Sequence, residues 1–354
     1  MDAHARGVAA RPWSTLNPVL EEILRQGNTV VLLKGATLLL DIAAHVPADE
    51  RPQISGLGAA TVAQDGEPRG TASLDAHLWW GRRLIDRAVP TSPDPRDDEI
   101  RAYAIAWYRT VSAILAAGSN LADLQPHVER SLRMFPGEAG ALFDAGCYAE
   151  TFASPMIQAA IIRREIKPSL ATAADTLRGY TRSTSRLLAE AETHFRDSIE
   201  RDPGLTEARV RLGRVLTTQG RVDAAAVELR KAVATPASSE VKYYAFLFLG
   251  RALEASNDAQ AAAEAYRSAA ALFPKAQSPH LAISRLAADG GDTRAAHERV
   301  DRVLRNSNDE AGRFDPWWLY HRCSGRDANV IYEEFSKRGR KLTMAAGVAM
   351  RSRR

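Results

Sequence analysis

The sequence predicts an all-α protein built from stacked antiparallel helix hairpins. Three observations support this prediction. Residue types repeat at a near-constant interval in the second half of the chain, apolar residues recur there at helical spacings of three and four, and no stretch alternates apolar and polar residues long enough to indicate a sheet. With 354 residues, 45% of them hydrophobic, the chain has ample apolar surface to bury in such an array.

The repeat interval is kept by several positions at once. A small residue recurs at spacings of 34, 37 and 34, and a larger apolar residue follows each one four positions later. These pairs are Ala191 with Phe195, Ala225 with Leu229, Ala262 with Tyr266, and Ala296 with Val300. A large and a small residue precede the last three at the same intervals, as Leu212-Gly213, Leu249-Gly250 and Ile283-Ser284. Independent positions in one register indicate structural repeats.

The N-terminal half is predicted to form less regular helices. Asn17 as cap and Pro18 at the first helical position begin one helix, which Gly27 ends. Residues 47–70 read as a long loop because they are rich in Gly, Pro and Ala. Helices are expected over residues 29–45, 71–88, 97–117, 121–135, 138–152 and 155–167, with an irregular link after Pro168.

The periodic half is predicted to form helix pairs. The turn residues Gly220, Asn257 and Gly291 separate the two helices of a pair, and Pro203, Pro236 and Pro274 close successive units. Helices are expected over residues 183–201, 206–219, 222–234, 239–256, 259–272, 279–288 and 293–305. The three-residue excess in the middle interval fits a longer loop near residues 237–239.

Residues 243–274 resemble the tetratricopeptide repeat (TPR). Leu249-Gly250 stands in the first helix, Ala262 opens the second, Tyr266 follows four residues later and Pro274 ends the unit. Residues 206–236 match with Leu229 in the aromatic place, residues 277–308 are degenerate, and residues 183–203 supply only a second helix. The resemblance implies a right-handed α-solenoid, a TPR-like superhelix, whose concave wall binds peptides.

These observations divide the chain into six expected segments. They are a helical pair (1–46), a flexible loop (47–70), a diverged helical region with or without degenerate repeats (71–182), TPR-like repeats (183–308), an aromatic C-terminal cap (309–335) and a basic, disordered tail (336–354). The cap is expected to cover the open face of the last repeat, as terminal units require, with a partner-docking patch as the alternative. Its Asp-Pro-Trp-Trp run also resembles the C-terminal segment of some bacterial repeat proteins.

Bulk properties favour a cytoplasmic protein without a membrane span. The longest apolar stretch, residues 30–46, contains Lys34 and Asp41 and is too short to cross a bilayer. No apolar run resembling a secretory signal precedes Leu20, so we expect the product to stay inside the cell unless the natural start lies upstream. Cys147 and Cys323, the only cysteines, form no disulfide framework or zinc spacing.

The net charge of +4 arises from the C-terminal tail. Residues 336–354 carry seven basic residues and no acidic one, whereas the rest of the chain has 40 basic and 43 acidic residues. Such a tail could touch RNA, DNA or an anionic membrane, or serve only as a solubilising end. A nucleic-acid-associated repeat protein is therefore an alternative function.

The sequence favours a non-enzymatic protein. It has no metal-binding histidine pair at helical spacing, no Gly-x-Ser-x-Gly and no phosphate-binding loop, so no cofactor or metal is expected. His297, Glu298 and Asp301 lie near one another on a predicted helix, where a solvated surface is the favoured interpretation. An enzyme whose site is assembled from distant residues remains a second alternative.

One constellation indicates partner binding. Arginine follows the small residue of each first helix, as Arg214, Arg251 and Arg285, and the resemblance implies that this position faces the concave wall. Guanidinium groups suit bidentate pairing with carboxylate or phosphate, so an acidic or phosphorylated peptide is the expected ligand. Tyr244, with Leu247 and Phe248, is expected to supply an apolar floor, with a place in the core as the alternative for Leu247 or Phe248. Chance placement is the alternative, because the chain holds 40 arginines and seven lysines.

The pattern departs from the clamp that some TPR proteins use for C-terminal carboxylates. Val210, Leu247 and Leu281 stand where that clamp would need basic or amide groups. The sequence therefore predicts a bacterial-type scaffold or adaptor that binds a protein or peptide in the groove of residues 183–308.

Overall fold

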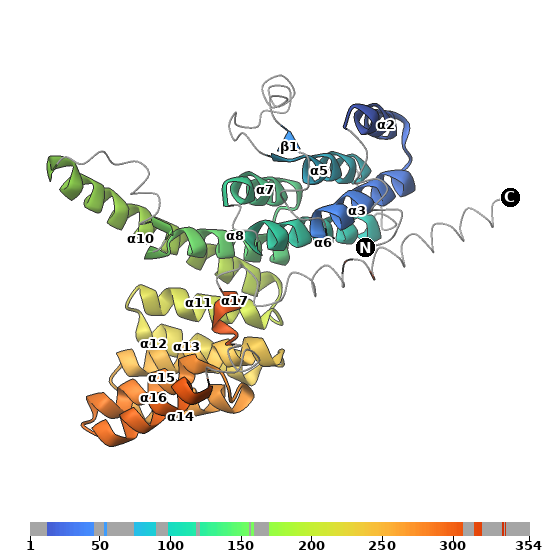
Figure 1. Cartoon of the computed structure of the whole chain (residues 1–354). Helices are drawn as coiled ribbons and strands as arrows, with labels where there is room; N and C mark the ends of the chain where they lie inside the picture. Colours follow the sequence, from blue (N-terminus) through green and yellow to red (C-terminus); the bar gives the residue numbers. More distant parts are fainter. Residues whose placement is uncertain are drawn as a thin grey trace. The chain divides into compact units, whose positions relative to one another are not determined.

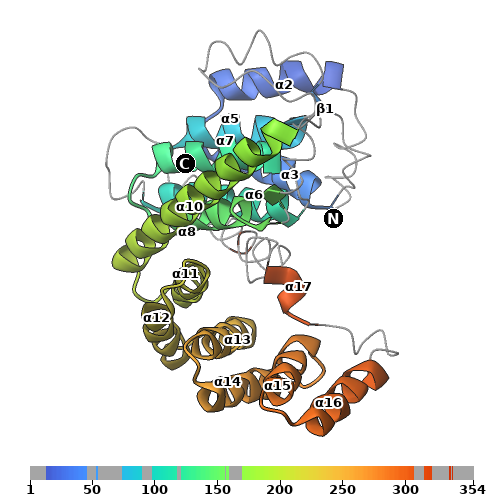
Figure 2. The same cartoon turned by 90° about the vertical axis from the view of Figure 1, so that its left-hand side faces the viewer.

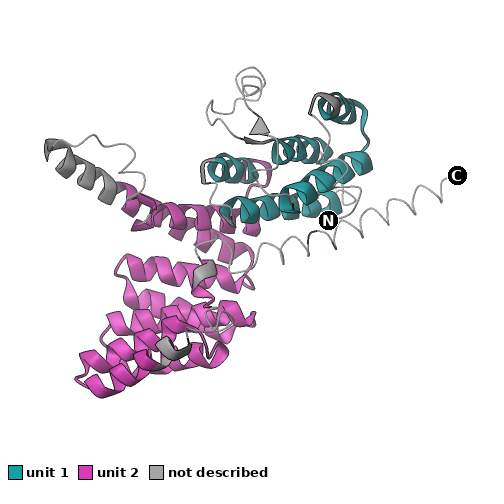
Figure 3. Cartoon of the chain, in the orientation of Figure 1, with its two compact units in different colours: residues 1–131, 327–354 teal, residues 132–326 magenta. Residues whose placement is uncertain are grey.

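We describe the protein from a computed structural model. The described residues are 13–45, 53–54, 74–89, 98–117, 121–155, 157–158, 170–306, 315–320, 335 and 337. The chain divides into two compact units (Figure 3), residues 1–131 with 327–354 and residues 132–326. We call them unit 1 and unit 2.

In the residues that the structure describes, unit 1 consists of helices and one short strand pair. Its helices are α2 (Trp13–Gln26), α3 (Thr29–His45), α5 (Ala76–Ala88), α6 (Asp98–Ala117) and α7 (Leu121–Met134), the last ending just beyond the unit boundary. The strands β1 (Gln53–Ile54) and β2 (Leu74–Asp75) pair antiparallel. Leu39, Leu84 and Trp107 are among its fully buried core residues.

Two predicted helix starts in unit 1 are wrong. Helix α2 begins at Trp13 and contains Pro18, so Asn17 is not its cap. The Asn17 side chain instead accepts a hydrogen bond from the indole Nε1 of Trp80 at 3.0 Å, a contact that the helix-start pattern does not reveal. Helix α5 begins at Ala76 because Leu74 and Asp75 belong to β2.

Unit 2 is a solenoid of helix hairpins, with helices following one another along an arc (Figures 1 and 2). The helices are α8 (Ala139–Phe152), α10 (Leu170–Arg201), α11 (Thr206–Thr218), α12 (Val222–Ala234), α13 (Ser239–Ala255), α14 (Ala259–Leu272), α15 (Gln277–Asp289), α16 (Thr293–Asn306) and α17 (Trp317–Tyr320). Each helix from α10 to α15 packs against the next in the chain, and α11 also contacts α13 and α8. The predicted stacking of helix pairs is confirmed.

Glycine allows the two helices of a hairpin to cross closely. A Cβ atom added to Gly213 would lie 2.4 Å from the Leu229 side chain, and one added to Gly250 would lie 2.5 Å from the Tyr266 ring. In the degenerate last hairpin, the Ser284 hydroxyl donates to the Ala296 carbonyl at 2.8 Å. The large-small pattern therefore encodes the contact between the helices of each pair.

Turn residues between the paired helices adopt the expected left-handed backbone. The φ angles are 79° at Gly220, 63° at Asn257 and 87° at Gly291. Glycine and asparagine tolerate this conformation, whereas most side chains are strained in it. The side chain of Asp258 caps the following helix by accepting from the backbone N–H of Ala261 at 3.0 Å.

The first hairpin of unit 2 is formed by α8 and α10. A Cβ on Gly146 would lie 2.5 Å from the Phe195 ring, the same relation as in the later pairs. The helix expected over residues 183–201 begins at Leu170, so the expected irregular link after Pro168 is wrong in part. We expected residues 183–203 to supply only the second helix of a repeat unit. The structure shows that this unit also has a first helix, which is α8.

Several predicted features lie outside the described residues. These include most of the loop at 47–70, most of the helix at 155–167, and the tail at 336–354 apart from Lys337. Among the helices that the structure describes, we find none that is both long and apolar enough to cross a membrane.

Candidate functional site

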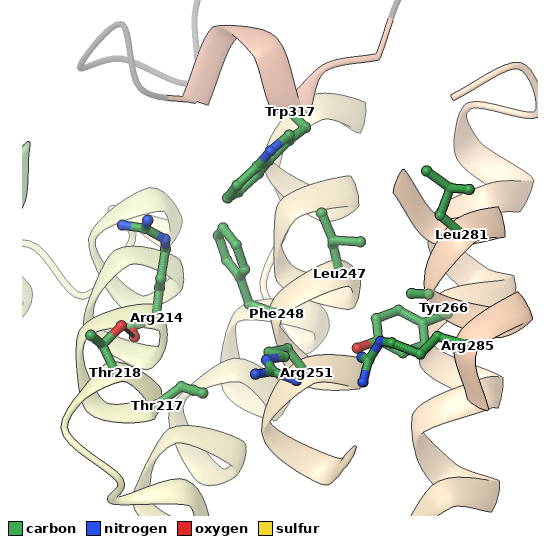
Figure 4. Close-up of a pocket in the computed structure, with 11 residues that line it drawn as sticks. Arg214, Thr217, Thr218, Leu247, Phe248, Arg251, Tyr266, Leu281, Arg285 and Trp317 are labelled. Atoms are coloured by element: carbon green, nitrogen blue, oxygen red, sulfur yellow. Dashed lines mark hydrogen bonds between the residues drawn. The ribbon is translucent and has the colours of Figure 1, made fainter. Parts of the chain in front are cut away.

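A pocket of about 910 Å³ opens in unit 2 between the first helices of three successive hairpins (Figure 4). Helices α11, α13 and α15 supply its walls, and Trp317 from α17 forms a further wall. The three arginines of the repeated position line it, together with apolar side chains and two threonines. The complete lining is Arg214, Thr217, Thr218, Leu247, Phe248, Arg251, Tyr266, Leu281, Ala282, Arg285 and Trp317.

The repeated register brings the three arginines together because each follows the small residue that faces the partner helix. Arg251 and Arg285 have 58% and 46% of their side chains exposed, whereas Arg214 has 23%. The two exposed guanidinium groups lie near each other beside Tyr266 (Figure 4). The pocket therefore presents two accessible cations at one end and a half-buried one at the other.

Arg251 and Arg285 share one carboxylate. Arg251 Nη1 donates to Glu254 at 3.1 Å, and Arg285, from the next hairpin, also pairs with Glu254. The Tyr266 hydroxyl donates to the same carboxylate at 2.9 Å. Burial would raise the pKa of Glu254, but the hydrogen bonds from Arg285 and Tyr266 outweigh it and lower that pKa, so Glu254 stays ionised.

Arg214 belongs to a buried ion-pair network that links three parts of unit 2. Its Nη1 lies 2.6 Å from Glu150 Oε1 of α8, while Arg211 Nη1 lies 2.9 Å from Glu150 Oε2. Arg211 also pairs with Glu207 at 3.1 Å, and Tyr320 donates its hydroxyl proton to Glu150 at 2.7 Å. Burial would raise the pKa of Glu150, but the charges of Arg214 and Arg211 lower it overall.

The balance of these charges determines which arginines can bind an anion. Arg211 and Arg214 are balanced by Glu150 and Glu207, so this network is neutral as folded. Arg251 and Arg285 face the single carboxylate of Glu254, apart from a longer 3.9 Å approach of Arg285 to exposed Asp289. The arginine pair therefore leaves about one uncompensated positive charge, which could bind one carboxylate.

Apolar side chains form the middle of the pocket. Leu247 and Phe248 are 8% and 6% exposed, so each contributes both to the core and to the pocket lining. Leu281 is 45% exposed, a large apolar side chain open to solvent. This arrangement suits an aliphatic or aromatic side chain placed next to an acidic group.

Tyr244 does not line this pocket. It is fully buried, its ring packs against Phe248 and Tyr320, and its hydroxyl donates to the Pro316 carbonyl at 2.5 Å. The structure therefore places Tyr244 beneath the 315–320 segment, where it can support the floor without contacting a pocket ligand.

Helix α17 lies on the inner side of the arc formed by the helices of unit 2 (Figure 2), and we call the surface that residues 315–320 contact there the groove. The contacts of this segment fall on α8, α11, α13 and the start of α15: Tyr320 reaches Glu150 and Arg211, Pro316 reaches Tyr244, and Asp315 reaches Tyr243 and Ser278. This differs from the expected cap over the last repeat. The expected 309–335 cap is also divided, because Phe335 is buried in unit 1 against Tyr103.

The acidic partners of the arginines were missed at the level of sequence. Glu150 and Glu254 each stand four residues after the glycine of a first helix, at Gly146 and Gly250. This shared position is a signal that the sequence contains, but it becomes visible only once α8 is aligned as the first helix of a repeat. The sequence gives no repeat signal for Arg211, because the equivalent positions of the later hairpins are Phe248 and Ala282.

Neither a family model nor a curated protein matches the sequence. Solved structures resemble it at low identity. MamA from Desulfovibrio magneticus RS-1 is 17% identical with a TM-score of 0.40, covering 58% of this chain and 96% of MamA. YrrB, described as a TPR protein with an unusual peptide-binding site, is 14% identical with a TM-score of 0.39, covering 58% and 88%. PilF from Pseudomonas aeruginosa is 15% identical with a TM-score of 0.43, covering 73% and 93%.

Three features of the chain itself define its repeats: positions that recur at intervals of 34 and 37 residues, hairpins that cross at glycine or serine, and left-handed turns between paired helices. This chain is a TPR-like helical-repeat protein.

Proposed function

We propose that this protein is a non-enzymatic scaffold that binds a partner protein through an extended peptide in the pocket of α11, α13 and α15. The observation that carries the proposal is the meeting of Arg251 and Arg285, from successive hairpins, beside exposed apolar surface. Two accessible guanidinium groups share the one carboxylate of Glu254 there, so the pair can also bind a carboxylate from a ligand.

The charge balance favours a peptide with one acidic residue next to an aliphatic or aromatic one. The carboxylate would pair with Arg251 and Arg285, and the apolar side chain would rest on Leu247, Phe248 and Leu281. A doubly charged phosphate would exceed the one uncompensated charge, so a carboxylate fits better than a phosphorylated residue. Arg214 supports the wall instead of binding the peptide, because Glu150 already holds it.

A paired peptide library tests this proposal. Fluorescent heptapeptides, each containing one Leu or Phe next to Asp, are compared with the same peptides in which Asn replaces Asp. We expect the unmodified chain to prefer the Asp member of the best-binding pair by about tenfold, or roughly 1.4 kcal/mol, as a charge-assisted hydrogen bond contributes. Arg251→Glu should abolish this preference.

Arg267→Glu is the matched control, since Arg267 is exposed on α14 and does not line the pocket. Circular dichroism establishes that both variants remain folded. Equal binding of Asp and Asn peptides to the unmodified chain would contradict the proposal, as would an Asp preference that survives in folded Arg251→Glu protein.

A further inference from the structure

The segment 315–320 is held in the groove by polar contacts at both of its ends. Asp315 is 1% exposed, and its carboxylate accepts from the Tyr243 hydroxyl at 2.6 Å, the Ser278 backbone N–H at 2.7 Å and the Trp317 backbone N–H at 2.9 Å. The next carbonyl, of Pro316, accepts from Tyr244. The start of the segment therefore satisfies donors from α13 and α15.

The other end is fixed by Tyr320. Its ring lies below the guanidinium groups of Arg211 and Arg214, at 4.4 and 4.9 Å from the ring centroid. Its hydroxyl donates to Glu150, and its carbonyl accepts from Arg211 at 3.3 Å. Between the two ends, Trp317 packs edge-on against Phe248 with ring centroids 5.6 Å apart. The segment thus spans the first helices of successive hairpins, as a bound peptide would.

The geometry points to this groove as a recognition site for partners carrying the pattern Asp-Pro-aromatic-x-x-Tyr, with residues 315–320 as the copy that occupies it within the chain. The inference does not depend on the Arg251–Arg285 pair of the proposed function, because its polar contacts involve Glu150, Arg211, Tyr243 and Tyr244. The two sites share Phe248 and Trp317, which also line the pocket. A partner with this pattern would bind by replacing the chain's own segment.

The selectivity follows from buried groups that the occupant must satisfy. Tyr243 and Tyr244 are fully buried donors, and Arg211 is 1% exposed. An occupant without a carboxylate at the first position would leave the Tyr243 hydroxyl without its acceptor. An occupant without a hydroxyl at the last position would leave the Glu150 carboxylate with one hydrogen bond fewer. Such unsatisfied buried groups cost more than a missing surface contact, so the groove should discriminate strongly between peptides.

The chain's own segment competes with any partner because it is tethered. A tethered segment acts at an effective concentration of the order of millimolar, so a free peptide binds the unmodified chain weakly even when its contacts are the same. Weakening the tethered copy without changing the groove should therefore reveal binding of a free one.

A synthetic peptide with the sequence of residues 313–322, labelled with fluorescein, tests the inference on the full chain by fluorescence anisotropy. We expect Asp315→Asn protein to bind this peptide about tenfold more tightly than the unmodified protein. The peptide with Asn in place of its own Asp should bind the Asp315→Asn protein about tenfold more weakly than the parent peptide. Adding Tyr243→Phe, which removes a groove donor, should cancel the gain.

The inference is overturned if the Asp and Asn peptides bind Asp315→Asn protein equally, or if neither binds. If circular dichroism shows that Asp315→Asn protein does not fold, the same two peptides are titrated into the unmodified chain up to millimolar concentration. A preference for the Asp peptide then supports the inference, and equal or absent binding contradicts it. Arg251→Glu should leave the affinity for this peptide within about twofold, so failure of the proposed function and of this inference are separate results.

Discussion

Glycine at a hairpin crossing determines how closely two helices of unit 2 approach. At Gly146, Gly213 and Gly250, an added methyl group would overlap the side chain of the paired helix at 2.4 to 2.5 Å. The opposing residues are Phe195, Leu229 and Tyr266. These side chains are fully buried in a packed interior, so the small residue is a packing requirement and not a matter of helix propensity.

Gly250→Ala is therefore expected to destabilise unit 2 by about 1–3 kcal/mol, despite the better helix propensity of alanine. The free energy of unfolding from urea titration measures this. Gly290→Ala is the control, because the nearest atom to a Cβ there lies at an ordinary 3.4 Å and its effect should stay within about 0.5 kcal/mol. Equal effects of the two substitutions would show that the crossing is not tightly packed.

A buried histidine makes the stability of unit 1 depend on pH. His127 stacks on the Tyr108 ring, donates from Nε2 to the Tyr108 carbonyl at 2.9 Å, and is 4% exposed. Burial, aided by the charges of Arg82 and Arg130, lowers the pKa of His127 to about 3. In the unfolded chain its pKa returns to about 6.5, so the unfolded state binds a proton that the folded state refuses.

The free energy of unfolding of unit 1 therefore keeps its full value above about pH 6.5 and falls progressively as the pH is lowered from about 6.5 to about 3. We expect the free energy of unfolding to fall by up to about 1.4 kcal/mol per pH unit in this window from His127 alone. His127→Gln should flatten that slope, measured by urea titration at several pH values, while His280→Gln is the control for removing a histidine. Parallel slopes for the unmodified and His127→Gln proteins would exclude this contribution.

The pairing of α8 with α10 extends the repeat array upstream of the region where the sequence shows it. Gly146 faces Phe195 as Gly250 faces Tyr266, and the Ser198 hydroxyl donates to the Ala139 carbonyl at 2.8 Å between the same helices. The two residues of the crossing are separated by 49 positions here, compared with 16 in the later hairpins. The extra 33 residues hide the repeat from any search for a constant interval.

We expect Gly146→Ala and Phe195→Ala to be coupled. Gly146→Ala alone should cost about 1–3 kcal/mol by overpacking, and Phe195→Ala alone about 3–5 kcal/mol by leaving a cavity. Together they should cost clearly less than the sum, because the new methyl group occupies space that the ring has left. Unfolding free energies of the four proteins measure the coupling, and additivity within about 0.5 kcal/mol would mean that the two residues do not meet.

The elements were predictable to different degrees for physical reasons. Helices α12 and α14 begin and end at the predicted residues because their small-residue pattern and the turns before them are local signals. The start of α2 was not predictable from local signals, because Asn17 makes a long-range contact with Trp80 instead of capping the helix. The start of α10 was missed because Pro168 suggested an irregular link over residues that are helical from Leu170.

The site was predictable only in part. Register alone brought Arg214, Arg251 and Arg285 to one pocket, since equivalent positions of a repeat lie on one wall. Register could not show that Glu150 already neutralises Arg214, because that contact joins residues 64 positions apart. Nor could it show that residues 315–320 return to the groove, which depends on packing between distant segments.

In the whole molecule, the candidate binding residues and the excess positive charge belong to different parts of the chain. The groove and pocket consist of residues of unit 2, whereas the excess positive charge lies in residues 336–354. Phe335, just before the tail, is buried against Tyr103 and should be kept in any truncation.

Removing residues 336–354 is expected to leave binding of the 313–322 peptide to the Asp315→Asn protein within about twofold. Any retention on immobilised DNA or RNA that weakens with salt should be lost, because seven basic residues are removed. Anisotropy and elution in a salt gradient measure the two effects. Salt-dependent retention that persists in the truncated chain would assign nucleic-acid binding to the folded units instead.

Both the pocket and the groove depend on first helices of successive hairpins lying side by side, so that distant residues form one wall. A double-mutant cycle on Glu150 and Arg214, from α8 and α11, measures this juxtaposition through unfolding free energies of the Glu150→Gln, Arg214→Gln and doubly substituted proteins. Their 2.6 Å contact predicts a coupling clearly above about 1 kcal/mol, because Glu150→Gln leaves Arg214 without its carboxylate partner, whereas Arg214→Gln leaves the buried Glu150 with one charged partner fewer. A coupling of zero within about 0.5 kcal/mol would contradict the stacked arrangement.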